Sequence, residues 1–386
     1  MGDIAVDPFG LRSLDLAELT ARSGAKWHRV QPRLAAWVAD MDFPVAPVIR
    51  DALAAAVNGD LGYPDWPYLG RSPLPEITVE RMHARFGWEP DIDRLHELSD
   101  VMQAVQLAVH HLTEPGDGVV LHTPAYHPFL QTLETTGRRL VAVPSPFDHD
   151  ELDARLAHEP ARLMILCNPH NPTGHVFTRP ELTQIADIAA RHDIVVVADE
   201  VHADLVHAPN VHVAFETVGP DVSARSITVT SPSKAFNVAG LRWAILHAGH
   251  APMHDVMRSM PRHYFGAPNI LSTTAAAAAW TQSDDWLAAV KEVLDENRQA
   301  LVGLLATHLP GVRYCVPEAT YLAWLDCREL GLGDDPAAAF RSAGVELSPG
   351  PQFGPGGVGH ARLNFATSPS VLEKIVATMG LVSGGS

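Results

Sequence analysis

Cysteine and basic residues are both scarce in this 386-residue sequence, and each shortage argues against a class of function. Only three cysteines occur, Cys167, Cys315 and Cys327, and none belongs to a C-x-x-C pair. The sequence therefore predicts neither a disulfide framework nor a zinc site. Its 28 lysines and arginines are outnumbered by 45 acidic residues, which gives a formal net charge of −17. Because a surface for nucleic acid or an anionic membrane needs a basic patch, we expect neither partner.

Long apolar runs are also missing. No window approaches the ~20 apolar residues that a membrane-spanning helix needs. The first ten residues, MGDIAVDPFG, carry acids where a signal peptide has a basic segment. We therefore expect a cytoplasmic protein. Hydrophobic residues make up 46% of the sequence, and its length suits two associated domains.

Short apolar runs alternate with helix-like segments through most of the chain, which is typical of a mostly parallel α/β sheet. Thr178-Arg-Pro-Glu181 reads as a capping box that opens one helix, and another helix is expected after Asp100. The expected strands are continuous apolar or β-branched runs, as in sheets covered on both faces. They lie at residues 119–121, 163–166, 194–198 and 227–230.

Three regions are predicted along the chain. Residues 1–45 read as an irregular N-terminal arm that packs with a small domain, and residues 46–280 as a large domain. Residues 281–386 read as the smaller α/β domain, with an amphipathic helix at 286–308 and strands near 321–325 and at 362–365.

The strongest chemical signal is a lysine directly after a predicted buried strand. The segment reads Ser231-Pro-Ser-Lys234-Ala-Phe-Asn-Val-Ala-Gly240-Leu-Arg242. Lysine is seldom left inside a fold without a partner, and an aldehyde cofactor supplies one by forming an imine with the amine. On these residues alone, a structural lysine and a cofactor-binding lysine both remain open.

Two further polar clusters also follow predicted strands. Asn168-Pro-His-Asn171-Pro-Thr-Gly174 comes after one strand, and Asp199-Glu-Val-His202 comes after the next. Because ligands of open α/β sheets bind at the carboxyl ends of the strands, the three clusters are expected to face one crevice. An ordinary Asn-Pro turn and a helix-capping Asp are the alternatives, but three clusters together favour a shared site.

With these segments in place, the sequence resembles the fold-type I enzymes of the aspartate aminotransferase superfamily, almost from end to end. The resemblance implies an α/β fold, with a large domain built on a mostly parallel sheet flanked by helices and a smaller α/β C-terminal domain. It also implies pyridoxal 5′-phosphate (PLP) as the cofactor, carried by Lys234 as a Schiff base. The same lysine is then expected to move the proton at the substrate's Cα.

The resemblance implies roles for other residues around the cofactor ring and the substrate. Asp199 resembles the carboxylate that pairs with the pyridine nitrogen, Asn171 the donor to the ring's 3-oxygen, and Tyr126 the aromatic that stacks on the ring. Arg362 resembles the arginine that clamps the substrate carboxylate in a bidentate pair. His202 stands where typical aminotransferases place a tyrosine that bonds the 3-oxygen.

The cofactor phosphate is expected at the start of the helix that follows residue 100. Ser231 and Arg242 resemble its ligands, and the backbone N–H groups of Val101 and Met102 would add a helix N-terminus, which favours anions. Asp100 departs from the pattern, because many relatives have glycine there and an acid is unfavourable beside a phosphate. A cap on its own helix, with the side chain turned away, is the alternative role for Asp100.

The finer resemblance is to the cystathionine β-lyase and C–S lyase branch. The implied substrate is an S-substituted cysteine such as cystathionine, and the implied reaction is an α,β-elimination to pyruvate, ammonia and a thiol. Ala39 is expected to contact the substrate. The resemblance rests on Lys26-Trp27, Trp37-Val-Ala-Asp-Met-Asp-Phe43, Gly62-Tyr63-Pro64, Thr113-Glu-Pro-Gly-Asp-Gly-Val119 and Arg362-Leu-Asn-Phe-Ala-Thr.

Tyr63 resembles the tyrosine that a neighbouring subunit lends to the phosphate and the substrate. A homodimer with shared active sites is therefore implied, with Tyr63 and Lys234 as the catalytic residues. A tyrosine buried beside a proline turn is the alternative. Two other functions stay open. An aminotransferase would use the same cofactor site, and a binding or regulatory module with a PLP fold would show no turnover.

Two remaining patterns are not predicted to form sites. Gly354-Pro-Gly356-Gly-Val-Gly359 matches a dinucleotide-binding fingerprint, but too little chain follows it for a βαβ unit. His247, His250 and His254 are close in sequence, yet Pro252 interrupts the helix that would align the last two. No metal site is expected.

Overall fold

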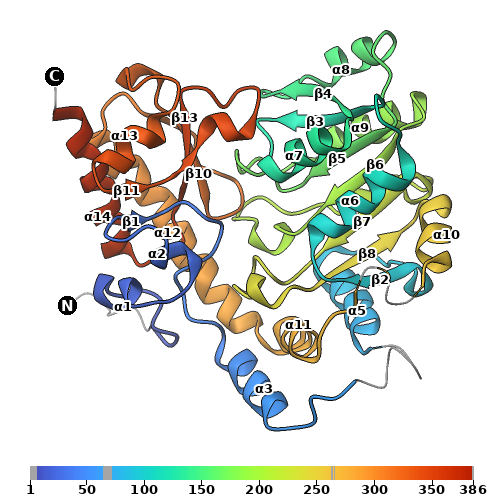
Figure 1. Cartoon of the computed structure of the whole chain (residues 1–386), viewed down its shortest axis with the longest axis horizontal. Coiled ribbons are helices and arrows are strands. Elements are labelled where there is room, and N and C mark those ends of the chain that lie inside the picture. Colours follow the sequence, from blue (N-terminus) through green and yellow to red (C-terminus); the bar gives the residue numbers. More distant parts are fainter. Residues whose placement is uncertain (1–6, 64–71, 262–263, 265, 385–386) are drawn as a thin grey trace.

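The computed structural model describes residues 7–63, 72–261, 264 and 266–384. Its larger sheet has seven strands in the order β2-β8-β7-β6-β5-β3-β4 (Figure 1). The five strands from β7 to β4 run parallel, and β8 pairs antiparallel with both of its neighbours. The strands are β2 (Leu95–Leu98), β3 (Gly118–Thr123), β4 (Arg139–Pro144), β5 (Leu163–Cys167), β6 (Val195–Asp199), β7 (Ser226–Thr230) and β8 (Ala244–Ala248).

All four strands expected from apolar runs form, and every residue of β3, β5, β6 and β7 is buried. Alternate residues supply two separate cores, because successive side chains of a strand point to opposite faces. In β3, Val119 and Leu121 join one core and Val120 joins the other. Burial on both faces explains why these strands read as unbroken apolar runs.

Helices cover both faces of this sheet. One face packs against α6 (Val101–Leu112), α7 (His127–Thr136) and α10 (Ala251–Ser259). The other face packs against α8 (His149–Leu156) and α9 (Arg179–Arg191). The predicted fold class, a mostly parallel sheet flanked by helices, is therefore confirmed.

Two smaller sheets draw their strands from the ends of the chain. A four-stranded antiparallel sheet has the order β12-β13-β10-β9, and β1 pairs in parallel with β11. The strands are β1 (Leu34–Ala35), β9 (Arg313–Tyr314), β10 (Leu322–Asp326), β11 (Val345–Glu346), β12 (Ser348–Pro349) and β13 (His360–Asn364).

The N-terminal arm, expected to be irregular, contains α1 (Leu16–Thr20), α2 (Ala25–His28) and β1. Its apolar side chains share one core with the C-terminal elements. The boundaries at residues 46 and 281 stay a prediction. The remaining α-helices of the described residues are α3 (Pro47–Val57), α5 (Leu74–Phe86), α11 (Ile270–Gln282), α12 (Asp284–His308), α13 (Pro336–Ser342) and α14 (Pro369–Met379).

The predicted helix starts are confirmed at two places. Thr178 and Glu181 form a reciprocal capping box at α9, with backbone N–H groups bound by the opposite side chain. Asp100 caps α6, since its carboxylate accepts a hydrogen bond from Gln103 N at 2.8 Å. Among the helices of the described residues, none has the length and apolarity required to cross a bilayer.

A buried arginine joins α5 to the segment that follows β6 of the large sheet. Arg81 donates to both carboxylate oxygens of Asp204, at 3.1 and 3.0 Å. It also donates to the Trp280 carbonyl at 3.0 Å and to Asp284 at 3.1 Å, at the junction of α11 and α12. Both Arg81 and Asp204 are buried, so the loss of either charge would leave the other without full compensation.

We predict that Arg81→Met lowers the free energy of unfolding by about 3 kcal/mol, because it leaves the Asp204 carboxylate buried. Arg85, 3.3 Å from Asp204, keeps part of the compensation. The matched control is Arg225→Met, which breaks the exposed pair with Asp193 and is expected to cost about 1 kcal/mol or less. Urea unfolding of both variants measures the difference, and equal losses would contradict this account.

Candidate active site

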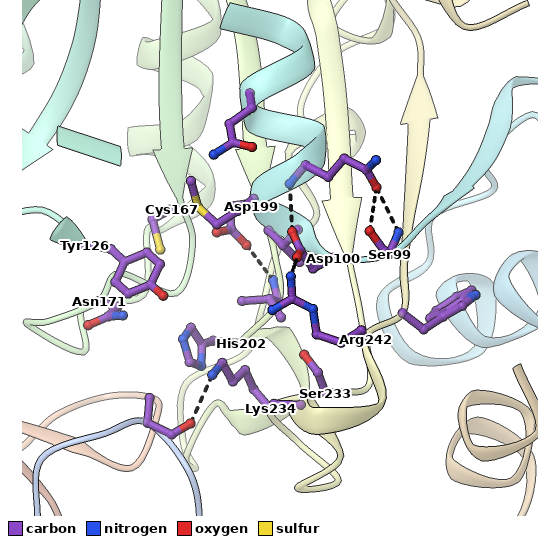
Figure 2. A pocket seen from close by; sticks show the side chains of 18 residues that line it. Ser99, Asp100, Tyr126, Cys167, Asn171, Asp199, His202, Ser233, Lys234 and Arg242 are labelled. Carbon is purple, nitrogen blue, oxygen red and sulfur yellow. Dashed lines mark hydrogen bonds and ion pairs between the residues drawn. The ribbon is translucent and has the colours of Figure 1, made fainter. Parts of the chain in front are cut away.

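A cavity of about 560 Å³ opens at the carboxyl edge of the parallel strands. β5, β6 and β7 each lead into a loop that carries one of the polar clusters found in the sequence, and β3 leads to Tyr126. Figure 2 shows the side chains from these loops converging on one space beneath the start of α6. The lining residues are Ala39, Ser99, Asp100, Val101, Met102, Gln103, Gln106, Tyr126, Cys167, Asn171, Asp199, Val201, His202, Ser233, Lys234, Ala239, Arg242 and Trp243.

Lys234 reaches into this cavity from the loop after β7 (Figure 2). Its amine donates a hydrogen bond to the Ala39 carbonyl at 3.0 Å. Desolvation lowers the pKa of Lys234 below its ordinary value, although the nearby Asp40 carboxylate acts in the opposite direction. A lysine amine with a lowered pKa is more often unprotonated, and so more of it is available to act as a nucleophile or as a base.

Asp199 is the last residue of β6 and is 4% exposed. Its carboxylate accepts a hydrogen bond from Val201 N at 3.1 Å. Burial raises the pKa of Asp199 to about 7, because the charged form loses hydration that these contacts do not replace. A cation bound next to this carboxylate would restore its ionised form.

His202 lies at the same end of β6 and is also buried. Burial, together with the positive charges of Lys234 and Arg362, lowers the pKa of its imidazole to about 3. The ring is therefore neutral at physiological pH. Its buried Nδ1 has no hydrogen-bond partner within the described part of the chain. An orphaned polar atom at this place is what a site for a polar ligand would contain.

Asn171 and Tyr126 line the side of the cavity nearest β5 and β3. Asn171 Oδ1 accepts a hydrogen bond from Arg362 at 3.0 Å, which ties the loop after β5 to β13. Gly174, in the same loop, has a positive φ of 73°, and a Cβ there would lie 2.4 Å from Pro317 Cβ. The glycine thus lets the loop approach the C-terminal part of the chain closely.

Arg362 is 3% exposed and does not itself line the cavity. Besides Asn171, its guanidinium donates to the Trp37 carbonyl and the Ser348 hydroxyl, both at 3.0 Å. Burial lowers the pKa of Arg362 to about 10, so the group remains protonated at neutral pH. Within the described residues no carboxylate pairs with it, and its Nε has no partner. A buried cation without a counter-ion favours an anionic ligand.

The expected phosphate end of the cavity is only partly as predicted. Val101, Met102 and Arg242 line it, but Ser231 does not, because its hydroxyl donates to the Trp243 carbonyl at 2.6 Å. Ser233, two residues later, lines the cavity instead.

Asp100 caps α6, as its alternative role required, but its carboxylate is not turned away from the cavity. It forms an ion pair with Arg242 (Figure 2).

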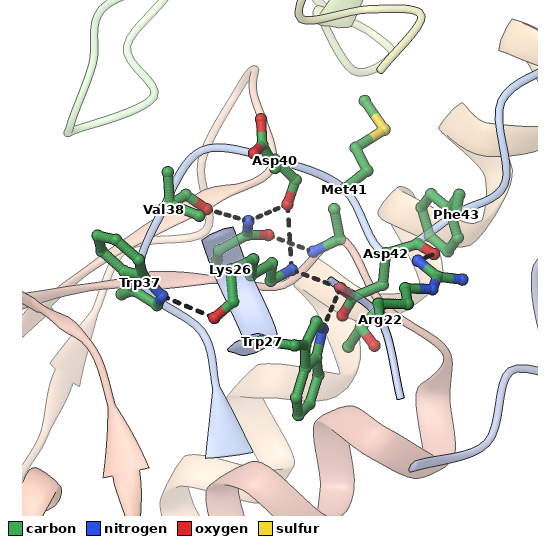
Figure 3. A network of polar contacts seen from close by, with 12 residues as sticks. Arg22, Lys26, Trp27, Trp37, Val38, Asp40, Met41, Asp42 and Phe43 are labelled. Atoms are coloured by element: carbon green, nitrogen blue, oxygen red, sulfur yellow. Dashed lines mark hydrogen bonds and ion pairs between the residues drawn. The ribbon is translucent and has the colours of Figure 1, made fainter. Parts of the chain in front are cut away.

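An irregular strap, residues 37–43, contributes Ala39 to the cavity and is held by side chains (Figure 3). Lys26 bonds the Asp40 carbonyl and the Asp42 carboxylate, each at 3.0 Å, and both charged groups are buried. Asn364 donates to the Val38 and Asp40 carbonyls at 2.7 and 2.6 Å. These contacts fix the strap that presents the Ala39 carbonyl to the lysine of the cavity.

Several cavity residues were not expected from the sequence: Ser99, Gln103, Gln106, Cys167, Val201, Ser233, Ala239 and Trp243. Most lie next to a residue that was expected, so proximity along the chain was the available signal. Tyr63 lies outside this chain's own cavity and is 89% exposed. Its neighbour Pro64 lies outside the described residues.

Comparison with known proteins places the site in a family. The family model for class I and II aminotransferases matches residues 95–379. The chain belongs to this family. A cystathionine β-lyase of Bacillus subtilis is 32% identical, over 92% of this chain and 95% of its own. A cystathionine β-lyase of Corynebacterium glutamicum is also 32% identical, over 94% and 98%. The solved structure of a PLP-bound C–S lyase from Staphylococcus hominis has a TM-score of 0.85 and 27% identity, covering 94% of this chain and 96% of its own.

We predict that Asp199 makes the stability of the cofactor-free protein depend on pH. A folded-state pKa near 7, against an ordinary value of 3.8, means that the stability contributed by neutral Asp199 is fully present below about pH 4. That contribution is lost as the pH rises to about 7. The free energy of unfolding of the wild type, measured in urea, should therefore fall over this range relative to that of Asp199→Asn. The expected fall is a few kcal/mol, at about 1.4 kcal/mol per pH unit.

The matched control is Asp187→Asn, on the exposed side of α9. It should follow the wild type at every pH. A constant difference between the wild type and Asp199→Asn from pH 4 to 7 would show that the raised pKa is wrong.

Proposed function

We propose that this chain is a PLP-dependent carbon–sulfur β-lyase that converts cystathionine or a related S-substituted cysteine to pyruvate, ammonia and a thiol. The observation that carries the proposal is the meeting of Lys234 and Asp199 in one cavity, with Arg362 bonded to the cavity residue Asn171. None of the three forms an ion pair within the described residues, so each is provided for something that binds there. The names of the near full-length relatives support the choice of a C–S lyase.

The residues fit the cofactor at both of its ends. Lys234 would hold the aldehyde carbon through Nζ, and Asp199 would face the pyridine nitrogen. The positive charge of the protonated nitrogen would lower the raised pKa of Asp199. Tyr126, Asn171 and His202 would surround the ring, with the orphaned Nδ1 of His202 as one open polar atom. The phosphate would lie against Arg242 and the backbone N–H groups of Val101 and Met102.

PLP, when bound, accepts the electron pair left by a bond broken at the substrate's Cα, which no side chain of the protein can do. The protein's own part is to bind, orient and move protons. Arg362 would bind the α-carboxylate in its fork and so fix which Cα bond breaks. Lys234 Nζ would take the Cα proton, and burial contributes by keeping more of the amine in the neutral form that can accept a proton.

An aminotransferase is the second candidate function, since the family model carries that description. Both reactions begin with loss of the Cα proton to Lys234. They differ in whether a thiolate then leaves Cβ or a proton is returned to the cofactor. Residues 37–43 and His202 resemble the lyase branch and favour the first outcome. A binding module without turnover would have no use for Asp199 and Lys234 in these positions.

The proposal includes a homodimer in the cytoplasm. Tyr63 lies outside the cavity of its own chain and is largely exposed, as expected for a side chain that completes a neighbour's site. Val57 and Leu61, which precede Tyr63 in the chain, are also exposed apolar side chains, which suits a segment covered in an assembly. The scarcity of cysteine suits a reducing compartment.

We predict that the enzyme releases pyruvate, ammonia and a thiol from cystathionine over many turnovers without an added keto acid. Elimination restores the starting form of the cofactor in each cycle, whereas transamination stops after one turnover until a keto acid arrives. Lactate dehydrogenase-coupled detection of pyruvate, alongside a thiol reagent, measures both products. Alanine, which has no leaving group at Cβ, is the control substrate. A single turnover that continues only when a keto acid is supplied would identify an aminotransferase instead.

We also predict that two inactive variants restore activity when their subunits are mixed. In a dimer of one Lys234→Ala chain and one Tyr63→Ala chain, both defects fall in one of the two shared sites and the other is intact. Counting sites, each mixed dimer should recover roughly half of the wild-type activity. Each variant mixed with itself under the same exchange conditions is the control. No recovery, once subunit exchange is shown by mass, would mean that Tyr63 acts within its own chain or not at all.

A further inference from the structure

Asp100 is bonded to two groups at the end of the cavity where the proposed function places the phosphate. One of its carboxylate oxygens accepts a hydrogen bond from Gln103 N, in the first turn of α6, at 2.8 Å. The other oxygen forms the ion pair with Arg242. Figure 2 shows Asp100 between the guanidinium and the end of the helix, and Asp100 lines the cavity.

These are the groups that an incoming phosphate would use. A phosphate binds at a helix N-terminus because the free N–H groups and the helix dipole favour an anion. An arginine binds it through charge-assisted hydrogen bonds. The Asp100 carboxylate contacts the same two partners, so an anion from the chain itself already lies there. The phosphate must then displace it from Arg242 or lie beside a like charge.

Capping of α6 does not by itself explain an acid at position 100. Asparagine and serine cap helices about as well as aspartate does, and neither would repel a phosphate. The negative charge, rather than the capping oxygen, is the part of Asp100 that acts on the ligand. Ser99 adds to this end of the cavity without a charge, since its backbone and hydroxyl both donate to the Gln103 side chain at 2.9 Å.

We propose that Asp100 is a specificity-determining residue that competes, as an internal anion, with the cofactor phosphate for Arg242 and the first turn of α6. This role rests on the proposed function, because it presumes that PLP is the ligand. Its consequence is a cofactor that exchanges more readily than it would in the same site without the charge. The effect is confined to the phosphate end and spares the ring end, where Lys234 and Asp199 lie.

The test measures the affinity of the full-length, cofactor-free protein for two ligands that differ only in the phosphate. PLP and pyridoxal are titrated separately into wild type, Asp100→Asn and Asp148→Asn, and binding is followed by the imine absorbance band. Asp100→Asn keeps the cap and removes the charge. Asp148→Asn is the matched control, since Asp148 caps α8 in the same way, accepting from Glu151 N at 2.8 Å, outside the cavity.

For Asp100→Asn we expect PLP to bind about tenfold more tightly, as for removal of one like charge near a partly exposed anion. The affinity of Asp100→Asn for pyridoxal should be unchanged. Asp148→Asn should bind both ligands with the affinity of the wild type. Equal or weaker PLP binding by Asp100→Asn would overturn the proposal and would mean that Asp100 instead orients Arg242. An equal gain with pyridoxal would also overturn it, because the effect would not act on the phosphate. If wild type forms no imine with either ligand, the proposed function itself fails, and the role of Asp100 fails with it.

Discussion

The carbonyl oxygen of Ala39 is the point on which the geometry of this site depends. It accepts a hydrogen bond from Lys234 Nζ at 3.0 Å and another from the buried hydroxyl of Tyr321 at 2.8 Å. Lys234 belongs to a loop of the large sheet, and Tyr321 lies just before β10 in the small one. A single backbone atom thus sets the position of the reactive amine relative to the C-terminal part of the chain. The neighbouring carbonyl of Trp37 does the same for Arg362.

A strap with such a role needs support that it cannot give itself. Residues 37–43 form neither helix nor strand, and buried carbonyl groups need donors from elsewhere. Lys26, Asn237 and Asn364 supply them from three separate parts of the chain. Because Lys26 also pairs with Asp42 in a buried place, loss of either charge would be costly as well as disruptive. The geometry around Lys234 therefore depends on the correct folding of the N-terminal segment.

The parts of the fold set by local physics were predictable from the sequence. Strands buried on both faces, such as β5 and β6, read as apolar runs, and the pair Thr178 and Glu181 fixed the start of α9. The gathering of Lys234, Asn171 and Asp199 at one edge followed from the topology of parallel strands. Here a short-range pattern and a general rule of the fold were enough.

The rest depended on contacts between residues far apart in the sequence. Ser231 and Ser233 are chemically alike, and only the path of the chain after β7 decides which one faces the cavity. The partners of Arg362 come from β12, the strap and the loop after β5, so no local pattern could reveal them. Nor could the sequence show that Asp100 both caps its helix and meets Arg242, because that requires the distance between two loops.

The buried ionisable groups of the site are of two kinds: one keeps its charge at neutral pH, and the others change charge easily. Arg362 remains cationic at neutral pH, so it can bind a carboxylate without any change of protonation. Asp199 and Lys234 have pKa values displaced toward their neutral forms, so a small change of surroundings alters their charge. Under the proposed function, Arg362, whose charge is fixed, would bind the substrate, and Lys234, whose charge is easily changed, would move the proton. Neither property selects between loss of a thiolate and return of a proton. That choice depends on the group attached to Cβ and on the space around it, which makes the substrate itself part of the specificity of the reaction.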